Sequence, residues 1–208
     1  MKINPKKSTC IRFGKGFNNQ CAQVCVDGVP LEWSTTLKYL GLTLKSAVKF
    51  SVDTRVCRSG FYKSFNAIYS KICKASADVI VSLVKSYCLP SLLYCVEVLD
   101  MNVSSLQSLD NPLLQAFAKI FKTFDKNILN SCMFYMNVVP PRFEHCIRKL
   151  KFIKNNLNSV NMLVSTICKL FGHNEIKTLD QKFKLNIDIT ANLFDVRESL
   201  RSNLLTIV

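Results

Sequence analysis

The hydrophobic pattern of this chain changes character near residue 50, and this change limits the folds open to it. Before that point apolar and polar residues alternate, which is typical of strands with one buried face. The alternating apolar positions are Ala22, Val24, Val26, Val29, Leu31 and Trp33. After it, apolar residues recur every third or fourth position, the period of an amphipathic helix. The sequence therefore predicts an α+β protein, in which a small N-terminal antiparallel sheet or hairpin precedes a mainly helical chain.

The N-terminal strands are expected to include a tight hairpin. Asp27-Gly28 separates two alternating runs, and this dipeptide favours the type I′ turn that joins antiparallel strands. A short strand is also predicted over 10–13. A further strand is predicted over 38–44, because Leu40, Leu42 and Leu44 would share one of its faces.

Helical periodicity covers most of the remaining chain. Apolar residues from Gly60 onward line one helical face, and lysines line the opposite face. Further helices are predicted over 76–99, 103–124, 142–171 and 190–205, and a short helix or turn is predicted over 127–137. Gly172 is expected to cap the 142–171 helix. Residues 173–189 are expected to form a polar, loosely ordered connection.

Residues 79–99 are apolar enough to raise the question of a membrane span. Lys85, Pro90 and Glu97 interrupt the stretch, and its apolar residues fall on a stripe. The pattern favours a buried helix kinked near Pro90, and no transmembrane segment is predicted.

Positive charge is concentrated in the first third of the chain. The whole sequence has 28 Lys and Arg against 14 Asp and Glu, a formal charge of +14. Residues 1–75 hold 13 of these cations and only three acids, Asp27, Glu32 and Asp53. This distribution indicates a polyanionic partner for one side of the molecule. The alternative is a surface excess that only aids solubility.

The ten cysteines are interpreted as reduced thiols. Six lie within apolar helical patterns, where a free Cys acts as a small buried hydrophobe; they are Cys57, Cys73, Cys88, Cys95, Cys146 and Cys168. The polar first residues do not resemble a secretory leader, so an intracellular protein, nuclear or cytoplasmic, is expected. There is no Cys-x-x-Cys, and the only histidines are His145 and His173. No metal site is expected.

No catalytic constellation is evident in the sequence. Nucleotidyl transfer needs paired carboxylates that hold two metal ions, and no two aspartates are adjacent. Gly14-Lys15-Gly16 lacks the spacing of a phosphate-binding loop. His145 beside Cys146 is interpreted as a packed helical pair and not as a thiol nucleophile with its base. The chain is therefore not expected to be an enzyme as it stands.

Two short motifs in the basic first third carry a resemblance to a known family. Asn4-Pro5-Lys6-Lys7-Ser8 precedes a short strand, and Lys38-Tyr39-Leu40-Gly41 follows about thirty residues later. This order resembles the end of the palm of the reverse transcriptase of non-LTR (LINE-like, jockey-type) retrotransposons. The resemblance extends over residues 1–100, weakens over 101–171 and is absent beyond.

The resemblance implies a nucleic-acid-binding role for particular residues. Asn4, Lys7 and Ser8 match a palm motif whose lysine lies near the phosphates of the incoming nucleotide, and Lys6 would contact a backbone phosphate. Lys38, Tyr39, Leu40 and Gly41 match the primer-grip hairpin, which holds the 3′ end of the primer. The helices that follow resemble the thumb, and Lys63, Lys71 and Lys74 would form the face along a duplex. The Arg148-Lys149-Leu150-Lys151-Phe152 run resembles a basic stretch that follows the thumb.

The expected organisation follows from this resemblance. Residues 1–49 would be a palm remnant, 50–126 a helical thumb and 127–208 a C-terminal helical region. The chain would be a truncated fragment that binds an RNA–DNA or DNA duplex without sequence preference. It would have no cofactor of its own, although the parent family uses Mg²⁺. The alternatives are a basic helical scaffold that binds an acidic protein, or the non-functional product of a decayed element. Because the strands would lack palm partners, their edges and apolar faces are expected to be exposed and their order to be partial.

Overall fold

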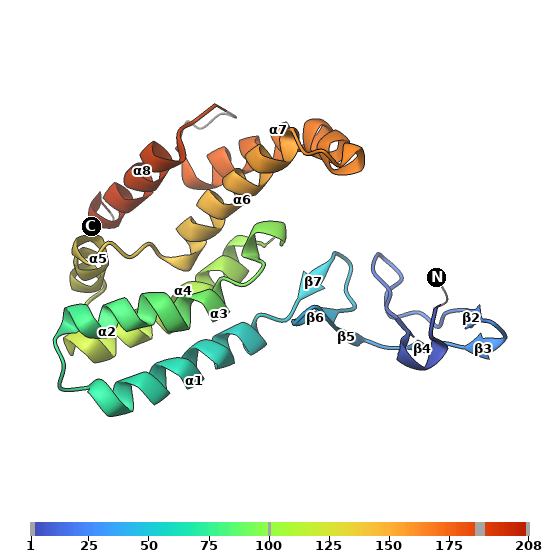
Figure 1. Ribbon diagram of the computed structural model, residues 1–208, viewed down its shortest axis with the longest axis horizontal. Helices are drawn as coiled ribbons and strands as arrows, with labels where there is room; N and C mark the ends of the chain where they lie inside the picture. The colour runs from blue at the N-terminus through green and yellow to red at the C-terminus, as the bar shows by residue number, and fades with distance from the viewer. Residues whose placement is uncertain (1–2, 100, 186–189, 207–208) are drawn as a thin grey trace. The chain divides into compact units, whose positions relative to one another are not determined.

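The chain consists of two compact units, each of which is described by itself. The computed structural model describes residues 3–99, 101–185 and 190–206. The units are Met1–Val56, called the N-terminal unit, and Cys57–Val208, called the helical unit. Short strands make up the regular structure of the first, and helices that of the second (Figure 1). The predicted α+β class is confirmed.

The N-terminal unit contains short strands that pair in three small groups. After the 3-10 helix η1 (Pro5–Lys7) these are β1 (Thr9–Cys10), β2 (Cys25–Val26), β3 (Val29–Pro30), β4 (Glu32–Trp33), β5 (Thr36–Tyr39), β6 (Leu42–Lys45) and β7 (Ser51–Val52). The hairpin predicted at Asp27-Gly28 is present, since β2 and β3 are antiparallel and the two turn residues have φ of 51° and 76°. Positive φ at both positions is the signature of a type I′ turn. The pairing of β1 with β4 is parallel, which the expected antiparallel sheet did not include.

The single strand predicted over 38–44 is wrong, because the chain turns back in its middle. β5 and β6 form an antiparallel hairpin in which Tyr39 pairs with Leu42. Leu40 and Gly41 make the turn with φ of 45° and 83°. Leucine rarely adopts positive φ, so the sequence pattern hid this turn behind an apparent alternation. β6 then pairs with β7.

Little apolar surface is buried in the N-terminal unit. Leu31, at 8 % exposure, is the only hydrophobic side chain below 9 % among the described residues 3–56. Hydrogen bonds connect its segments in place of a core: Gly14 N–H donates to the Ala47 carbonyl over 3.1 Å, and the Ser46 hydroxyl donates to the Arg12 carbonyl over 2.7 Å. A small buried area gives this unit little hydrophobic stabilisation.

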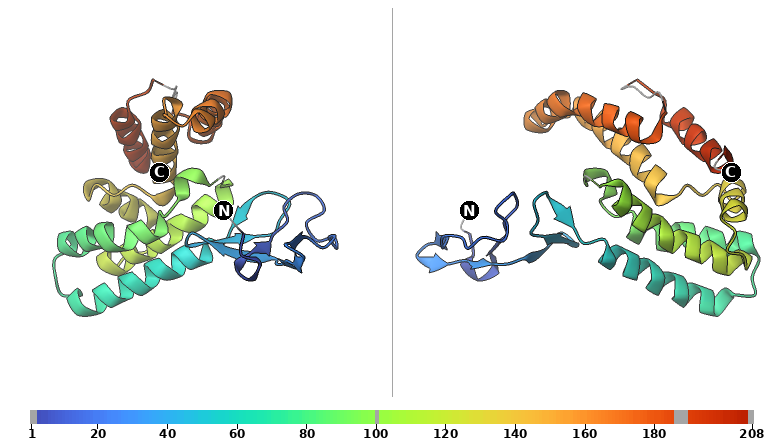
Figure 2. Two further views of the ribbon diagram at one scale, coloured as in Figure 1. Left: turned by 45° about the vertical axis from the view of Figure 1, so that its right-hand side comes forward. Right: turned by 180° about the vertical axis from the view of Figure 1, so that it is seen from behind.

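The helical unit is built from helices around a continuous apolar core. They are α1 (Arg55–Ile72), α2 (Ala77–Leu83), the π-helix η2 (Val84–Cys88), α3 (Leu89–Leu92), η3 (Val96–Val98), α4 (Val103–Phe121), α5 (Lys126–Tyr135), α6 (Pro141–Leu157), α7 (Met162–Phe183) and α8 (Leu193–Thr206). Figures 1 and 2 show α1, α2 and α4 running side by side, and α6 beside α7. The most deeply buried residues include Phe61, Leu113, Phe117, Leu150 and Leu200.

The apolar stretch 79–99 forms a helix that is shorter than predicted. A five-residue π segment, Val84–Cys88, lies directly before the turn that contains Pro90. The helix ends at Leu92, and Cys95 has φ of 56°, so the prediction of helix to residue 99 is wrong. A left-handed residue cannot continue a right-handed helix. None of the helices that the structure describes combines the length and hydropathy needed to cross a bilayer.

The predicted helix over 142–171 is two helices, α6 and α7. The chain breaks at residues 158–161, where Asn161 Oδ1 accepts hydrogen bonds from the backbone N–H groups of Leu163 and Val164. A side-chain acceptor at this position starts a new helix. α7 continues to Phe183, so most of the expected loose connection over 173–189 is helical. The last part of that prediction, residues 186–189, lies outside the described residues.

Gly172 does not cap a helix but lies inside α7, where it is buried against α6. A Cβ atom built there would lie 3.0 Å from Cγ2 of Ile153, a residue of 5 % exposure. Glycine therefore allows the two helices to approach closely, although it lowers the intrinsic helix propensity.

Substitution of Gly172 by a β-branched residue is expected to destabilise the α6–α7 contact. We expect Gly172→Val to lower the free energy of unfolding by about 1–3 kcal/mol, because added methyl groups in a packed interior force neighbours apart. Urea unfolding followed by circular dichroism measures the change. Asn174→Val, at an exposed position of the same helix, controls for the helix propensity of valine. An equal effect of the two variants would contradict the close contact.

Candidate nucleic-acid interface

The Asn4–Ser8 motif forms a compact turn at the entrance to β1. Asn4 Oδ1 accepts a hydrogen bond from Lys6 N over 3.1 Å and so caps the 3-10 helix η1. Ser8 Oγ donates to the Asn4 carbonyl over 2.9 Å. Asn4 and Ser8 are thus engaged in local structure, which is a common role for these residue types. Lys6 and Lys7 are exposed and present the charge of the motif to solvent.

The Lys38–Gly41 motif forms the end of the β5–β6 hairpin. Tyr39 and Leu40 are exposed at 60 % and 71 %, and Lys38 and Gly41 are also exposed. An apolar turn that projects into solvent is unusual, since its side chains gain little burial in the folded chain. The strained φ of Leu40 adds a second cost. Together these features leave the hairpin end open to a ligand.

Helix α1 carries a face that is basic and contains no acid. From Thr54 to Ala77 there is no Asp or Glu. Lys63, Lys71 and Lys74 are all exposed, and Lys74 lies just beyond the end of the helix at Ile72. Within the described chain none of these three lysines lies within ion-pair distance of a carboxylate. Their charge is therefore uncompensated by near neighbours. On the opposite face Phe61 and Phe65 are buried, as the periodicity predicted.

Asp53, just before α1, neutralises two other cations. Its carboxylate lies 3.0 Å from Lys45 Nζ and 3.0 Å from Arg55 Nη2. It also accepts a hydrogen bond from the backbone N–H of Arg55 over 3.0 Å. The hydrogen bonds from Arg55 and the charge of Lys45 hold the pKa of Asp53 well below its usual range. The carboxylate therefore stays ionised, and it compensates part of the charge of Lys45 and Arg55.

Lys119 extends the cationic surface beside α1 and was not found by sequence reasoning. It belongs to α4, yet its Nζ lies 4.8 Å from the centre of the Tyr69 ring and 5.8 Å from that of Phe65. Tyr69 in turn donates its hydroxyl to the Lys119 carbonyl over 3.1 Å. The cation–π contact fixes the lysine next to α1. Because 50 residues separate Tyr69 and Lys119, no local pattern could have revealed the pair.

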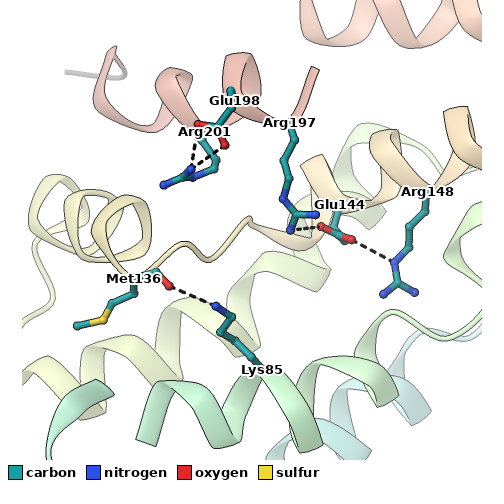
Figure 3. Close-up of polar contacts among 7 residues, drawn as sticks. All are labelled: Lys85, Met136, Glu144, Arg148, Arg197, Glu198 and Arg201. Carbon is teal, nitrogen blue, oxygen red and sulfur yellow. Dashed lines mark hydrogen bonds and ion pairs between the residues drawn. The ribbon is translucent and has the colours of Figure 1, made fainter. Parts of the chain in front are cut away.

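The basic run Arg148–Phe152 is partly neutralised within the molecule. Lys149 is 9 % exposed, and its Nζ lies 2.6 Å from Glu175 of α7. Glu144 pairs at 3.3 Å with Arg148 and at 3.3 Å with Arg197 of α8. Figure 3 shows Glu144 between the two guanidinium groups. This carboxylate therefore joins α6 to α8, and Lys151 is the exposed lysine of the run.

Arg201 makes a second tie between α8 and the rest of the helical unit. It pairs with Glu198 at 2.7 Å (Figure 3). It also donates to the Phe134 carbonyl of α5 over 3.0 Å. Its guanidinium also lies 5.0 Å from the centre of the Phe134 ring. These contacts are structural: the pair with Glu198 lies within α8, and the two contacts with Phe134 join α8 to α5.

The predicted packed pair His145–Cys146 is buried in α6. Their exposures are 1 % and 0 %, and His145 Nε2 lies 3.3 Å from the Leu99 carbonyl. Burial raises the pKa of Cys146 to about 12, which keeps the thiol protonated. A protonated buried thiol is a poor nucleophile. One of the cysteines predicted to be buried is not: Cys73, just after the end of α1, is exposed.

The described residues offer no obvious arrangement for metal chemistry. Within them, no three side chains of His, Cys, Asp or Glu come together as a metal-binding group. The exposed cations of η1, of the β5–β6 hairpin and of α1 are the described features that correspond to the predicted nucleic-acid contacts. No protein-family model, curated protein or solved structure matches the chain.

Proposed function

We propose that this chain is a palm-and-thumb fragment of a non-LTR retrotransposon reverse transcriptase that binds an RNA–DNA or DNA duplex without sequence preference. The acid-free basic face of α1 carries the proposal. Its three exposed lysines have no described carboxylate partner, so their pairing with phosphate would not first break an internal ion pair. Contacts of this kind are independent of base sequence and weaken with salt.

The two N-terminal motifs would add contacts to the primer strand. Lys38 would neutralise a phosphate, and Gly41 at the hairpin turn would let a sugar–phosphate backbone come close. Lys6 and Lys7 are exposed cations for the same purpose, while Asn4 and Ser8 would hold their turn in shape. Tyr39 and Leu40 would pack against sugar or base. These roles rest on the resemblance of the motifs to the primer grip and palm of the family.

In this proposal binding is the activity of the chain, and it needs no cofactor. The sequence contains no adjacent aspartates of the kind that hold catalytic Mg²⁺ in the family. The proposed place of action is inside the cell, in the nucleus or cytoplasm, where template and primer occur.

A duplex titration at two salt concentrations tests the proposal. With three phosphate contacts, we expect affinity for a short RNA–DNA heteroduplex to fall about 40-fold between about 50 and 200 mM salt. The combined substitution Lys63→Gln, Lys71→Gln, Lys74→Gln should reduce the slope of log affinity against log salt by about 2–3. Fluorescence anisotropy of a labelled duplex measures both quantities.

A charge-matched variant makes the test specific to α1. Lys169, Lys177 and Lys184 are exposed at the surface of α7 and its end, and their joint replacement by Gln removes the same charge. This control should lower affinity far less than the α1 variant. Absence of binding at low salt, or equal losses in the two variants, would exclude the α1 face as the duplex site.

A second candidate is a basic helical scaffold that binds an acidic protein, and α7 favours it. The outward side of its first half exposes Leu163, Ile167, Leu170 and Phe171. Exposed aliphatic groups on one helical face are typical of protein contacts and contribute little to phosphate binding. An acidic amphipathic peptide that bound through these residues and competed with no duplex would favour the scaffold. A chain that bound neither partner would fit the product of a decayed element.

A further inference from the structure

A cavity of about 580 Å³ lies within the helical unit between η3, α6 and α8. Its lining combines three cations, two carboxylates and exposed aromatic rings. The residues that matter for its chemistry are Glu97, Glu144, Arg148, Lys151, Phe194 and Arg197. The volume falls within the range of small-molecule sites, and the mixture of charge and aromatic surface is typical of pockets for polar, planar ligands.

The cationic side of the cavity is held in place before any ligand enters. Glu144 fixes Arg148 through Nε and Arg197 through Nη2, each at 3.3 Å (Figure 3). Arg148 Nη1 also donates to the Leu93 carbonyl over 3.2 Å. The lining thus has three cations, Arg148, Lys151 and Arg197, against the two carboxylates Glu97 and Glu144, and so carries a net positive charge. The cavity therefore keeps a positive rim whose arginines lose little freedom on binding an anion.

Glu97 supplies an acceptor that the described residues do not use. It lines the cavity, and its Oε2 is buried without a hydrogen bond from any described residue. A buried carboxylate oxygen without a donor is destabilising, and such atoms in native structures call for an explanation. A ligand whose N–H donors draw this carboxylate toward the cavity would remove the penalty.

Aromatic rings stand at the mouth of the same cavity. Phe194, in the first turn of α8, is 66 % exposed, and Phe152 of α6 is 37 % exposed. Phe194 is held by its backbone N–H, which donates to Asn192 Oδ1 over 3.0 Å. Lys154 of α6 donates to the Ala191 carbonyl and so ties the start of α8 to α6. Exposed phenyl rings on fixed backbone are the surfaces on which nucleobases stack.

We propose that this cavity binds a guanine nucleotide. The guanine edge carries two neighbouring donors, the ring N1–H and the exocyclic amine, which match the two oxygens of the Glu97 carboxylate. Adenine and cytosine offer only an amine at the corresponding edge. The base would stack on Phe194, and the phosphate would bind Lys151 and the fixed arginines. The site lies apart from the α1 lysines in the sequence and stands whether or not α1 binds a duplex.

Free nucleotide and single-stranded nucleic acid share this chemistry, and two probes distinguish them. The probes are guanosine monophosphate and a thymine hexanucleotide with one central guanine, each compared with its adenine counterpart. The full chain is titrated with each probe, followed by calorimetry and anisotropy. For at least one of the two probes, the guanine form should bind about tenfold more tightly than the adenine form. Binding of the mononucleotide identifies a nucleotide site, and binding of the hexamer alone identifies a strand site. If neither guanine probe binds more tightly than its adenine counterpart, the proposal is wrong.

Variants assign the binding to the cavity. Glu97→Gln should abolish the preference for guanine, because an amide offers only one acceptor. Phe194→Ala should weaken both guanine probes about tenfold through lost stacking, and this exposed side chain can be removed without disturbing the core. Lys151→Gln should weaken binding several-fold, while the matched Lys177→Gln should not. Unchanged guanine preference in Glu97→Gln, together with unchanged affinity in Phe194→Ala, would overturn the assignment. The α1 triple variant should bind the guanine probe normally, so failure of the duplex proposal leaves this result intact.

Discussion

Replacing Asp110 by asparagine is expected to remove a loss of stability that the helical unit undergoes between pH 4 and pH 7. Asp110 lies in α4 at 6 % exposure. Its Oδ1 accepts a hydrogen bond from the backbone N–H of Arg142 over 3.0 Å, and its Oδ2 lies 3.2 Å from Arg142 Nε. It therefore connects α4 to the first turn of α6.

The sign of the effect follows from the pKa of this carboxyl. Burial raises it from 3.8 to about 6, although the hydrogen bond and charge of Arg142 oppose the shift. Between about pH 3.8 and pH 6 the folded state binds more protons than the unfolded state, so the free energy of unfolding falls as pH rises. The whole pKa shift of Asp110 corresponds to about 3 kcal/mol in the free energy of unfolding. This contribution is retained below about pH 4 and is lost by about pH 7.

Urea unfolding of wild type and Asp110→Asn at pH 4, 5.5 and 7 measures the difference directly. Asparagine keeps an acceptor for Arg142 N–H but does not titrate, so the stability of wild type relative to the variant should fall by up to about 3 kcal/mol. Asp110→Ala, which loses the acceptor, should cost about 1–3 kcal/mol throughout. A difference between wild type and Asp110→Asn that stayed constant or rose with pH would show that the charge of Arg142 outweighs burial.

Backbone amides of the N-terminal unit are expected to exchange with solvent at least about a thousandfold faster than those at the centre of α4. The reason is the difference in burial. Leu31 is the one hydrophobe below 9 % exposure among described residues 3–56, whereas Leu113 and Phe117 are at 0 %. The strands are also two to four residues long, which is too short for much cooperative stability.

Hydrogen exchange read by mass spectrometry on peptides from β5–β6 and from α4 measures the contrast. A thousandfold ratio corresponds to about 4 kcal/mol in the free energy of opening. The β2–β3 hairpin provides an internal comparison, because its turn is favourable and its strands, like those of β5–β6, contain no buried residue. Protection of β5–β6 equal to that of α4 would contradict the expectation of a weakly ordered N-terminal unit.

The sequence predicted those features that depend on neighbouring residues. The dipeptide Asp27-Gly28 by itself favours a tight turn, and the structure contains the predicted hairpin there. Phe61 and Phe65 recur at helical spacing, and both are buried. The alternating pattern of residues 38–44 hid the turn at Leu40-Gly41, because leucine has no preference for positive φ; only the resemblance of residues 38–41 to the primer-grip hairpin implied one there. Its conformation follows from the pairing of β5 with β6 and not from the residue itself.

Contacts between distant segments were beyond local patterns. Gly172 was interpreted as a helix end, yet its role depends on Ile153 in another helix. Lys119 joins the basic surface only because Tyr69 packs beside it. The cavity around Glu97 needs three elements that the chain brings together from residues 97, 144–155 and 193–197. The motifs of residues 4–8 and 38–41 were visible as sequence, but their exposure and turn geometry were not.

The π segment Val84–Cys88 has a consequence for how this stretch of the chain can vary. A π turn holds one residue more than the α-helical turn it replaces, as a single inserted residue would produce. Deleting one exposed residue there, such as Ser86, would restore regular α-helix and leave the next helical turn close to its present orientation, because the π turn already accommodates the extra residue. Leu92 and Leu93, at 0 % and 4 % exposure, would then still face the core. A further insertion would instead rotate them by about 100° away from it. The segment between Leu83 and Leu89 is therefore expected to tolerate the loss of one residue better than the gain of another.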